Sequence, residues 1–294
     1  MRYIKELVVG VGLVFGLSSC SGSASDYSQK LCWSDVTLFA WSGIEHYSET
    51  RDRLYADAKH TILLSPDYAI ESKLTTDLES MIGDGIEVWL LIGANGTDAY
   101  PTPEYISKYL DFAKNYNQNH TQKITGISLD IEIWTKFTDQ RSPDNSSAWA
   151  DYLTYIKDVK DKISADTLQL SVEVPRWLSA IGNEPFPNAR PVSYDILDIV
   201  DELVIMDYTN DVEAFYSDVE SDLSYADSVG KRVKLALELG TKDPQKDIVS
   251  FYANPEDMIQ ILIKKVTHSS FDGYAIHTLD DLYSSQLDLS NCKI

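Results

Sequence analysis

The sequence predicts an α/β protein folded as a single (β/α)8 TIM barrel. Short apolar runs recur eight times along its 294 residues, and the segments between them carry apolar residues at the spacing of amphipathic helices. The competing fold, a doubly wound open sheet, usually has fewer strands and a glycine-rich phosphate turn after the first of them. Trp41-Ser-Gly43, which follows the first run, is not such a turn.

The expected elements follow from this alternation. In chain order, the apolar runs predict strands over residues 36–41, 61–65, 86–92, 124–132, 168–174, 202–208, 233–239 and 273–277. The clearest helical periodicity predicts helices over residues 103–117, 149–163, 213–229 and 255–266. The active site of such a barrel lies at the carboxyl ends of its strands.

The first residues of the chain predict an export signal and not an element of the barrel. Residues 1–19 have a basic beginning and an apolar run too short to cross a bilayer, which is typical of a signal peptide. Leu17-Ser-Ser-Cys20 resembles a bacterial lipobox, so Cys20 is expected to carry lipid, with ordinary cleavage near Ala24 as the alternative. Residues 20–32 are then a flexible tether and residues 33–294 the barrel. We expect a cell-envelope lipoprotein at the periplasmic face or cell surface, or otherwise a secreted protein.

Charge and cysteines limit the partners. A formal net charge of −21 disfavours nucleic acid and anionic lipid, so any membrane attachment should come from the lipid anchor. If Cys20 is lipidated, Cys32 and Cys292 remain as an even pair in an oxidising compartment. Both would lie at the amino-terminal face of a closed barrel, so a disulfide between them is expected. No close cysteine pair marks a metal site, no cofactor or metal is expected, and the protein is expected to be a monomer.

The fourth predicted strand ends in two carboxylates. In Gly126-Ile-Ser-Leu-Asp130-Ile-Glu132, alternation places Ser128, Asp130 and Glu132 on one face and the apolar residues on the other. Helices normally cover the apolar face, so the acidic face should line the barrel interior and its mouth. The structural alternative is an acidic strand end that caps a helix or pairs with a core arginine such as Arg176.

The other strand ends add aromatic and acidic residues. The set is Trp41, Ser65-Pro-Asp67, Gly93-Ala-Asn95, Trp134, Glu173, Pro175-Arg-Trp177, Asp207-Tyr208-Thr-Asn210, Glu238 and His277. Flat aromatic faces stack on sugar rings and paired acids cleave acetals, so the pattern predicts a carbohydrate site. Trp41, Trp134, Trp177 and Asp207 are the expected substrate-binding residues, whereas Trp89 and Trp149 are expected in the core.

These motifs resemble glycoside hydrolase family 18, the chitinase-type barrels. Gly126-Ile-Ser-Leu-Asp-Ile-Glu132 is similar to the end of that family's acidic signature, Met206-Asp-Tyr208 to its Met-x-Tyr, and 273–277 to its closing strand. The resemblance implies a (β/α)8 fold, Glu132 as general acid, Asp130 as the group that orients a substrate acetamide, and Tyr208 as a hydrogen-bond donor to the intermediate. It extends over the whole mature barrel, and the fourth-strand motif is its specific part.

The sequence departs from the family's pattern at positions that handle the substrate acetamide in that family. The family's two earlier aspartates are here Thr125 and Ser128, the aspartate after the tyrosine is Thr209, and the closing tryptophan is His277. Leu237-Glu238 and Ile276-His277 instead resemble a narrower set of bacterial barrels related to the family.

Two hydrolytic schemes and two other functions stay open. In one scheme Glu132 acts with the substrate's own acetamide as nucleophile. In the other it acts with Glu238 as nucleophile, at the roughly 5–5.5 Å of a retaining pair, and His277 is expected to position a carboxylate. The alternatives are an inactive carbohydrate-binding lipoprotein and, least favoured, a divalent-metal enzyme using Asp130, Glu132, Glu238 and His277.

Overall fold

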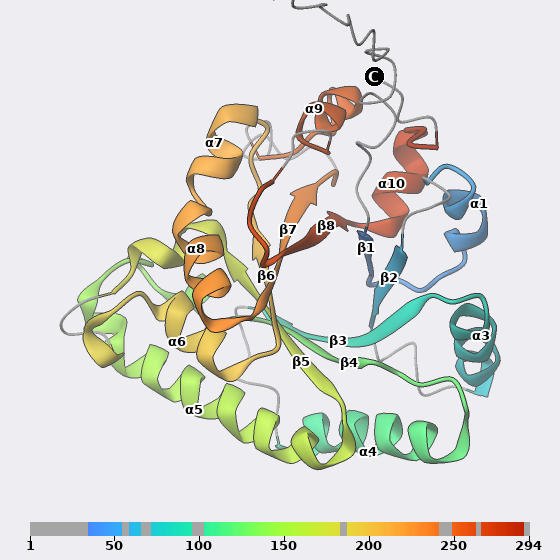
Figure 1. The fold of residues 1–294 in the computed structure, drawn as a ribbon, viewed down its shortest axis with the longest axis horizontal. Helices are drawn as coiled ribbons and strands as arrows, with labels where there is room; N and C mark the ends of the chain where they lie inside the picture. Colours follow the sequence, from blue (N-terminus) through green and yellow to red (C-terminus); the bar gives the residue numbers. More distant parts are fainter. Residues whose placement is uncertain are drawn as a thin grey trace, which may run out of the picture.

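The computed structural model describes residues 35–54, 59–65, 72–95, 103–182, 187–240, 249–262 and 266–290. Within them, eight strands pair in parallel and close into one barrel in chain order, with the helices around it (Figure 1). The predicted (β/α)8 barrel is confirmed. Cys20, Cys32 and Cys292 lie outside the described residues, and so do the predicted signal peptide, lipid site, tether and disulfide.

Each predicted apolar run overlaps one strand. The strands are β1 (Asp35–Ala40), β2 (Lys59–Leu64), β3 (Glu87–Asn95), β4 (Gly126–Glu132), β5 (Gln169–Pro175), β6 (Glu202–Met206), β7 (Arg232–Glu238) and β8 (Phe271–His277). β6 ends at Met206, before the predicted end at Tyr208, because the Asp207 N–H bonds locally to the Ile205 carbonyl. Tyr208 therefore lies on the turn just beyond the strand.

The helices are α1 (Tyr47–Arg51), α3 (Ser72–Gly83), α4 (Pro103–Asn119), α5 (Ser146–Ile163), α6 (Val192–Ile199), α7 (Val212–Ser217), α8 (Glu220–Val229), α9 (Met258–Leu262) and α10 (Leu279–Ser285). The single helix predicted over 213–229 is wrong, since α7 and α8 are separate. Asp218, between them, pairs with Arg176 at 2.9 Å, and Val219 turns fully into the core. The helix predicted over 255–266 begins instead with a short 3₁₀ turn (Pro255–Asp257) before α9.

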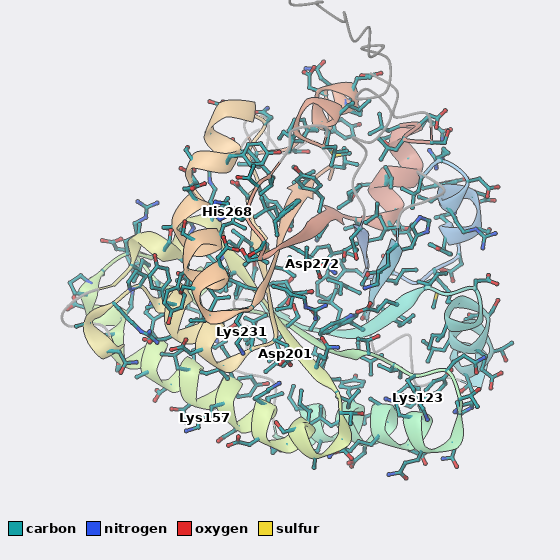
Figure 2. The ribbon with its side chains drawn as sticks, in the orientation of Figure 1. Lys123, Lys157, Asp201, Lys231, His268 and Asp272 are labelled. Carbon is teal, nitrogen blue, oxygen red and sulfur yellow. The ribbon has the colours of Figure 1, made fainter. Side chains whose placement is uncertain are left out.

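Ion pairs occupy the amino-terminal end of the barrel interior. Lys234 of β7 is 1% exposed, and its Nζ lies 3.6 Å from Glu202 Oε2 and 3.9 Å from Asp35 Oδ1. Arg232 lies 3.3 Å from Asp272, the second residue of β8 (Figure 2). Buried charges in proteins are normally paired in this way. These ion pairs occupy the amino-terminal end of the barrel interior, so the functional site is sought at the carboxyl ends of the strands.

A histidine outside the barrel ties the start of β8 to a helix. His268 Nδ1 lies 2.7 Å from Asp227 Oδ2 and its Nε2 3.1 Å from Glu220 Oε1, both on α8 (Figure 2). These contacts hold the chain before β8 against the outer layer. His268 therefore serves packing near the amino-terminal end of β8, away from the carboxyl ends of the strands.

Candidate active site

A polar cluster lies at the carboxyl ends of the strands. Its members are Trp41 after β1, Asp130 and Glu132 of β4, Glu173 of β5, Tyr208 after β6, Glu238 of β7 and His277 of β8. Burial raises the pKa of the Tyr208 hydroxyl well above its ordinary value, and the charges of four carboxylates raise it further. Those carboxylates are Glu238, Asp130, Glu132 and Glu173. All four charges disfavour the ionised form of Tyr208, so these carboxylates lie near its hydroxyl, and the structure brings the side chains to one mouth.

His277 connects several members of this cluster. Its Nδ1 lies 3.1 Å from Glu238 Oε2, and the Trp41 indole Nε1–H donates to its Nε2 at 3.1 Å. The Tyr208 ring lies beside it, with 5.8 Å between the ring centroids. Because an indole N–H can only donate, Nε2 must accept and the proton of the neutral imidazole sits on Nδ1, facing Glu238. The two bonds therefore select one tautomer of His277.

Both oxygens of Glu238 are engaged. Oε2 faces His277, and Oε1 accepts the backbone N–H of Gly240. The side chain is also buried. This carboxylate is fixed in orientation by two donors, one of them a catalytic candidate.

Trp41 can reach His277 because Gly93 makes room for it. A Cβ added at Gly93 would lie 2.5 Å from Trp41 Cη2 and 2.8 Å from Cζ3. Carbon atoms pack at roughly 3.5–4.0 Å, so no larger residue fits beneath the indole. Gly93, near the end of β3, therefore lets the Trp41 indole pack directly against the β3 backbone.

The two carboxylates of β4 are the groups for which the sequence predicts acid chemistry. Burial raises the pKa of Asp130 well above its ordinary value, and the charges of Glu173 and Glu132 raise it further. Burial also raises the pKa of Glu132, which remains partly exposed at the strand end. A raised pKa favours a carboxyl group that keeps its proton, as a general acid must.

Three predicted substrate-binding residues lie in different surroundings. Trp134 is 4% exposed and stacks on the core residue Trp149, with centroids 6.2 Å apart, so it offers little surface to a ligand. Trp177 is partly buried, edge-on to Trp134 at 6.2 Å. Asp207 is buried, and Arg176 Nη1 lies 3.5 Å from its Oδ1; burial raises the pKa of Asp207 to about 8.

Arg176 also settles one structural alternative from the sequence. Its guanidinium pairs with Asp207 and, at 2.9 Å, with Asp218, rather than with Glu132. Glu132 is therefore available to the mouth.

Glu173 belongs to the cluster; the sequence placed it among the strand-end residues of the site but assigned it no catalytic or binding role. It is fully buried, and Ser128 Oγ donates to its Oε1 at 2.5 Å. Burial raises the pKa of Glu173 to about 7. The alternation of polar Gln169, Ser171 and Glu173 along β5 was the available signal, since it puts the glutamate on the interior face.

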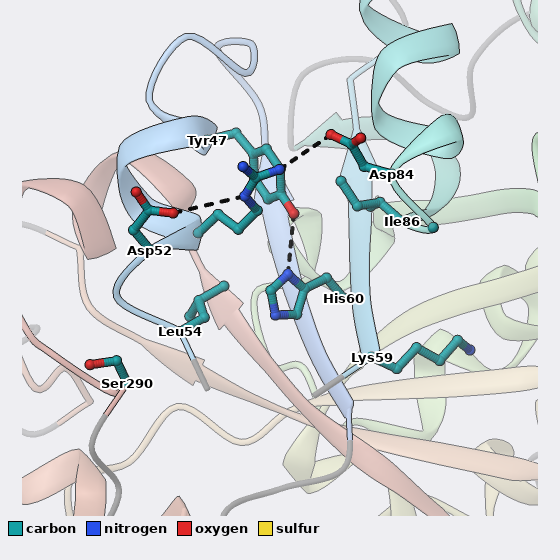
Figure 3. A pocket seen from close by; sticks show the side chains of 10 residues that line it. Tyr47, Asp52, Leu54, Lys59, His60, Asp84, Ile86 and Ser290 are labelled. Atoms are coloured by element: carbon teal, nitrogen blue, oxygen red, sulfur yellow. Dashed lines mark hydrogen bonds and ion pairs between the residues drawn. The ribbon is translucent and has the colours of Figure 1, made fainter. Parts of the chain in front are cut away.

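A separate cavity of about 520 Å³ lies elsewhere on the molecule (Figure 3). Its lining includes Tyr47, Arg51, His60 and Asp84, and it extends to Lys59, the first residue of β2. Tyr47 Oη lies 3.2 Å from His60 Nδ1, and Arg51 pairs with Asp84 at 3.2 Å. The cavity therefore borders the amino-terminal end of the barrel and contains none of the mouth residues.

Neither a group of metal-binding side chains nor a membrane-spanning helix occurs among the described residues. Within the seven described ranges, no group of three or more acidic, histidine or cysteine side chains is arranged to hold a metal ion. In the same part of the chain, no helix has the length and apolar character needed to span a bilayer.

The barrel is similar to those of two chitinase structures. One is a C-terminal domain assigned as a chitinase from Desulfitobacterium hafniense, with a TM-score of 0.54 and 11% identity over 88% of this chain and 99% of that one. The other is a chitinase from Chromobacterium violaceum, with a TM-score of 0.51 and 11% identity over 89% of this chain and 100% of that one. At this identity the similarity establishes the shared fold. No protein-family model and no curated protein matches the sequence.

Proposed function

We propose that the protein is a glycoside hydrolase in which Glu132 is the general acid. The observation that carries the proposal is the placement of Glu132: a partly exposed carboxyl group with a raised pKa, next to Asp130 at the barrel mouth. A barrel mouth lined by carboxylates and aromatic rings is suited to cleaving a glycosidic bond. The substrate class, a glycan containing N-acetylhexosamine, rests on the resemblance of residues 126–132 to family 18.

In the proposed reaction, Glu132 gives its proton to the glycosidic oxygen as the bond from that oxygen to the anomeric carbon breaks. The acetamide oxygen of the same sugar supplies the electron pair to that carbon, while Asp130 orients the acetamide and Tyr208 donates a hydrogen bond to it. Water then attacks the anomeric carbon as the bond from that carbon to the acetamide oxygen breaks and the acetamide is restored, and the proton that the water loses goes to the ionised Glu132.

The engagement of Glu238 favours this substrate-assisted scheme over double displacement. A nucleophilic carboxylate must present an oxygen to the sugar, whereas the Glu238 side chain is buried and both of its oxygens are held by donors of the protein. Glu238 acts instead as a positioning residue that holds His277 in its tautomer.

An inactive carbohydrate-binding protein is the second candidate. Its support is the burial of the acidic groups: Asp130 Oδ1 is shielded from solvent, and Glu173 and Glu238 are buried. The two candidates differ in one measurement, because Glu132→Gln should abolish cleavage and keep glycan binding in an enzyme, whereas a binding protein cleaves nothing in either form.

The location is also a proposal. The lipobox-like Leu17-Ser-Ser-Cys20 supports attachment of the protein to the cell envelope through lipid at Cys20, with a Cys32–Cys292 disulfide joining the chain ends. Mass spectrometry of the mature amino terminus and thiol titration of the unreduced protein test these two points. An unmodified terminus beyond Cys20, or two free thiols, would contradict them.

A further inference from the structure

Glu173 and Asp130 occupy adjacent positions on neighbouring strands. The register of β4 and β5 pairs Ser128 with Ser171 and Leu129 with Val172. Continuing this parallel register by one residue places Asp130 level with Glu173 on the same interior face. The backbones at Asp130 and Glu173 are therefore one strand spacing apart, about 4.8 Å, and both side chains start from neighbouring positions on the interior face.

Neither carboxyl group is fully satisfied by the protein. Glu173 Oε1 accepts the Ser128 hydroxyl, but its Oε2 is buried and has no hydrogen-bond partner among the described residues. Asp130 Oδ1 is likewise buried and unbonded within the described part of the chain. Two neighbouring buried carboxyl groups thus each present a free oxygen.

The surroundings supply little positive charge to this pair. The groups that act on it electrostatically are Glu132 on β4, Glu202 on β6 and His277 on β8, with the Tyr208 hydroxyl nearby. Two of these four are acidic. The barrel cation Lys234 pairs with Glu202 and Asp35 instead.

Two carboxylates on neighbouring strand positions, Glu173 fully buried and Asp130 with its Oδ1 buried, cannot both be ionised without a large cost. A single proton between them removes the repulsion and gives one of the free oxygens an O–H donor. The pKa values of Asp130 and Glu173 are both raised, which agrees with this arrangement. Part of the rise at Asp130 comes from the charge of Glu173.

We infer that Glu173 is a positioning residue of the active site, which shares one proton with Asp130 and so holds Asp130 ready to meet the bound sugar. The inference rests on the proposed function for the role of Asp130. The pairing itself depends only on the geometry of β4 and β5. Since Asp130 is partly exposed and Glu173 is not, the sugar would contact Asp130 alone.

The test is a ¹³C NMR titration of the side-chain carboxyl carbons in the full chain. In Glu173→Gln, which keeps the shape but removes the charge, the titration midpoint of Asp130 should fall by about one pH unit or more. An unchanged or higher midpoint would overturn the pairing. Asp222→Asn is the matched control, because Asp222 is also a buried carboxyl group that accepts a serine hydroxyl, from Ser193 at 2.6 Å. This control should leave the Asp130 midpoint where it is.

A second variant covers the case in which Glu173→Gln does not fold. Ser128→Ala removes the hydroxyl that lowers the pKa of Glu173, so the Glu173 midpoint should rise above its value of about 7 in the unmodified protein. A Glu173 midpoint near the ordinary 4.5 in either protein would contradict the inference.

The titration separates this inference from the proposed function. It needs no substrate, so a protein that cleaves no glycan can still show the paired titration. Conversely, if cleavage depends on Glu132 but the Asp130 midpoint ignores Glu173→Gln, the hydrolase proposal stands and the pairing fails. In an active enzyme, Glu173→Gln should also shift the pH profile of kcat/KM, which a purely structural role would not do.

Discussion

Gly93→Ala should disturb the site through Trp41. The added Cβ would lie 2.5 Å from Trp41 Cη2, so the indole must move by about 1 Å to regain a normal carbon contact. A shift of this size breaks the bond from Nε1 to His277 Nε2, which is 3.1 Å long. Overpacking of this kind usually costs about 1–3 kcal/mol, so the free energy of unfolding should fall by about that amount.

Urea unfolding measures this loss, and the NMR signal of the Trp41 indole N–H reports the broken bond. Gly83→Ala is the matched control: a Cβ there meets nothing within 4 Å and φ is not positive, so stability should stay the same or rise by up to about 1 kcal/mol. If Gly93→Ala is as stable as the unmodified protein and its indole signal does not move, the placement of Trp41 over Gly93 is wrong.

Three further predictions concern charge, aromatic contacts and pH. Lys234→Met removes the buried cation that Glu202 and Asp35 share, and among the described residues these carboxylates keep only the more exposed Arg232 and Lys59 as ion-pair partners. The free energy of unfolding should fall by about 3–5 kcal/mol in urea titrations, whereas Lys157→Met, at an exposed site on α5 (Figure 2), should change it by less than about 0.5 kcal/mol. Trp177→Ala should weaken glycan binding by about 1–3 kcal/mol in calorimetry. Trp134→Ala should instead lower the free energy of unfolding by about 3–5 kcal/mol. If Trp177→Ala binds the glycan as tightly as the unmodified protein does, Trp177 is not part of the site. A general acid works only when protonated, so kcat/KM should fall as pH rises through the raised pKa of Glu132; an alkaline limb at or below 4.5 would exclude Glu132 from this role.

The sequence predicted the barrel because its strands carry strong local signals. Each is short and apolar on at least one face, and the alternation of Ser128, Asp130 and Glu132 correctly placed the acidic face of β4 in the interior. The break between α7 and α8 was not predicted; it coincides with the Arg176–Asp218 pair, a contact between parts of the chain that lie far apart in the sequence.

The site was predicted in part for a similar reason. Strand ends could be enumerated from the sequence, and this enumeration found the residues that converge on His277. It could not show that the 3₁₀ turn Ile133–Lys136 folds Trp134 back into the core, because the direction of a side chain after a strand depends on that turn. Nor could it show that Glu173 stands beside Asp130, since the register between β4 and β5 is a tertiary property.

The most direct test of the account is a screen of oligosaccharides, including chito-oligosaccharides, against the unmodified protein and Glu132→Gln, with cleavage and binding measured on the same ligands. We expect the unmodified protein to cleave at least one N-acetylhexosamine-containing glycan, and we expect Glu132→Gln to bind it with similar affinity but no longer to cleave it. Binding without cleavage by both forms, or cleavage that survives in Glu132→Gln, would contradict the assignment of Glu132 as the general acid.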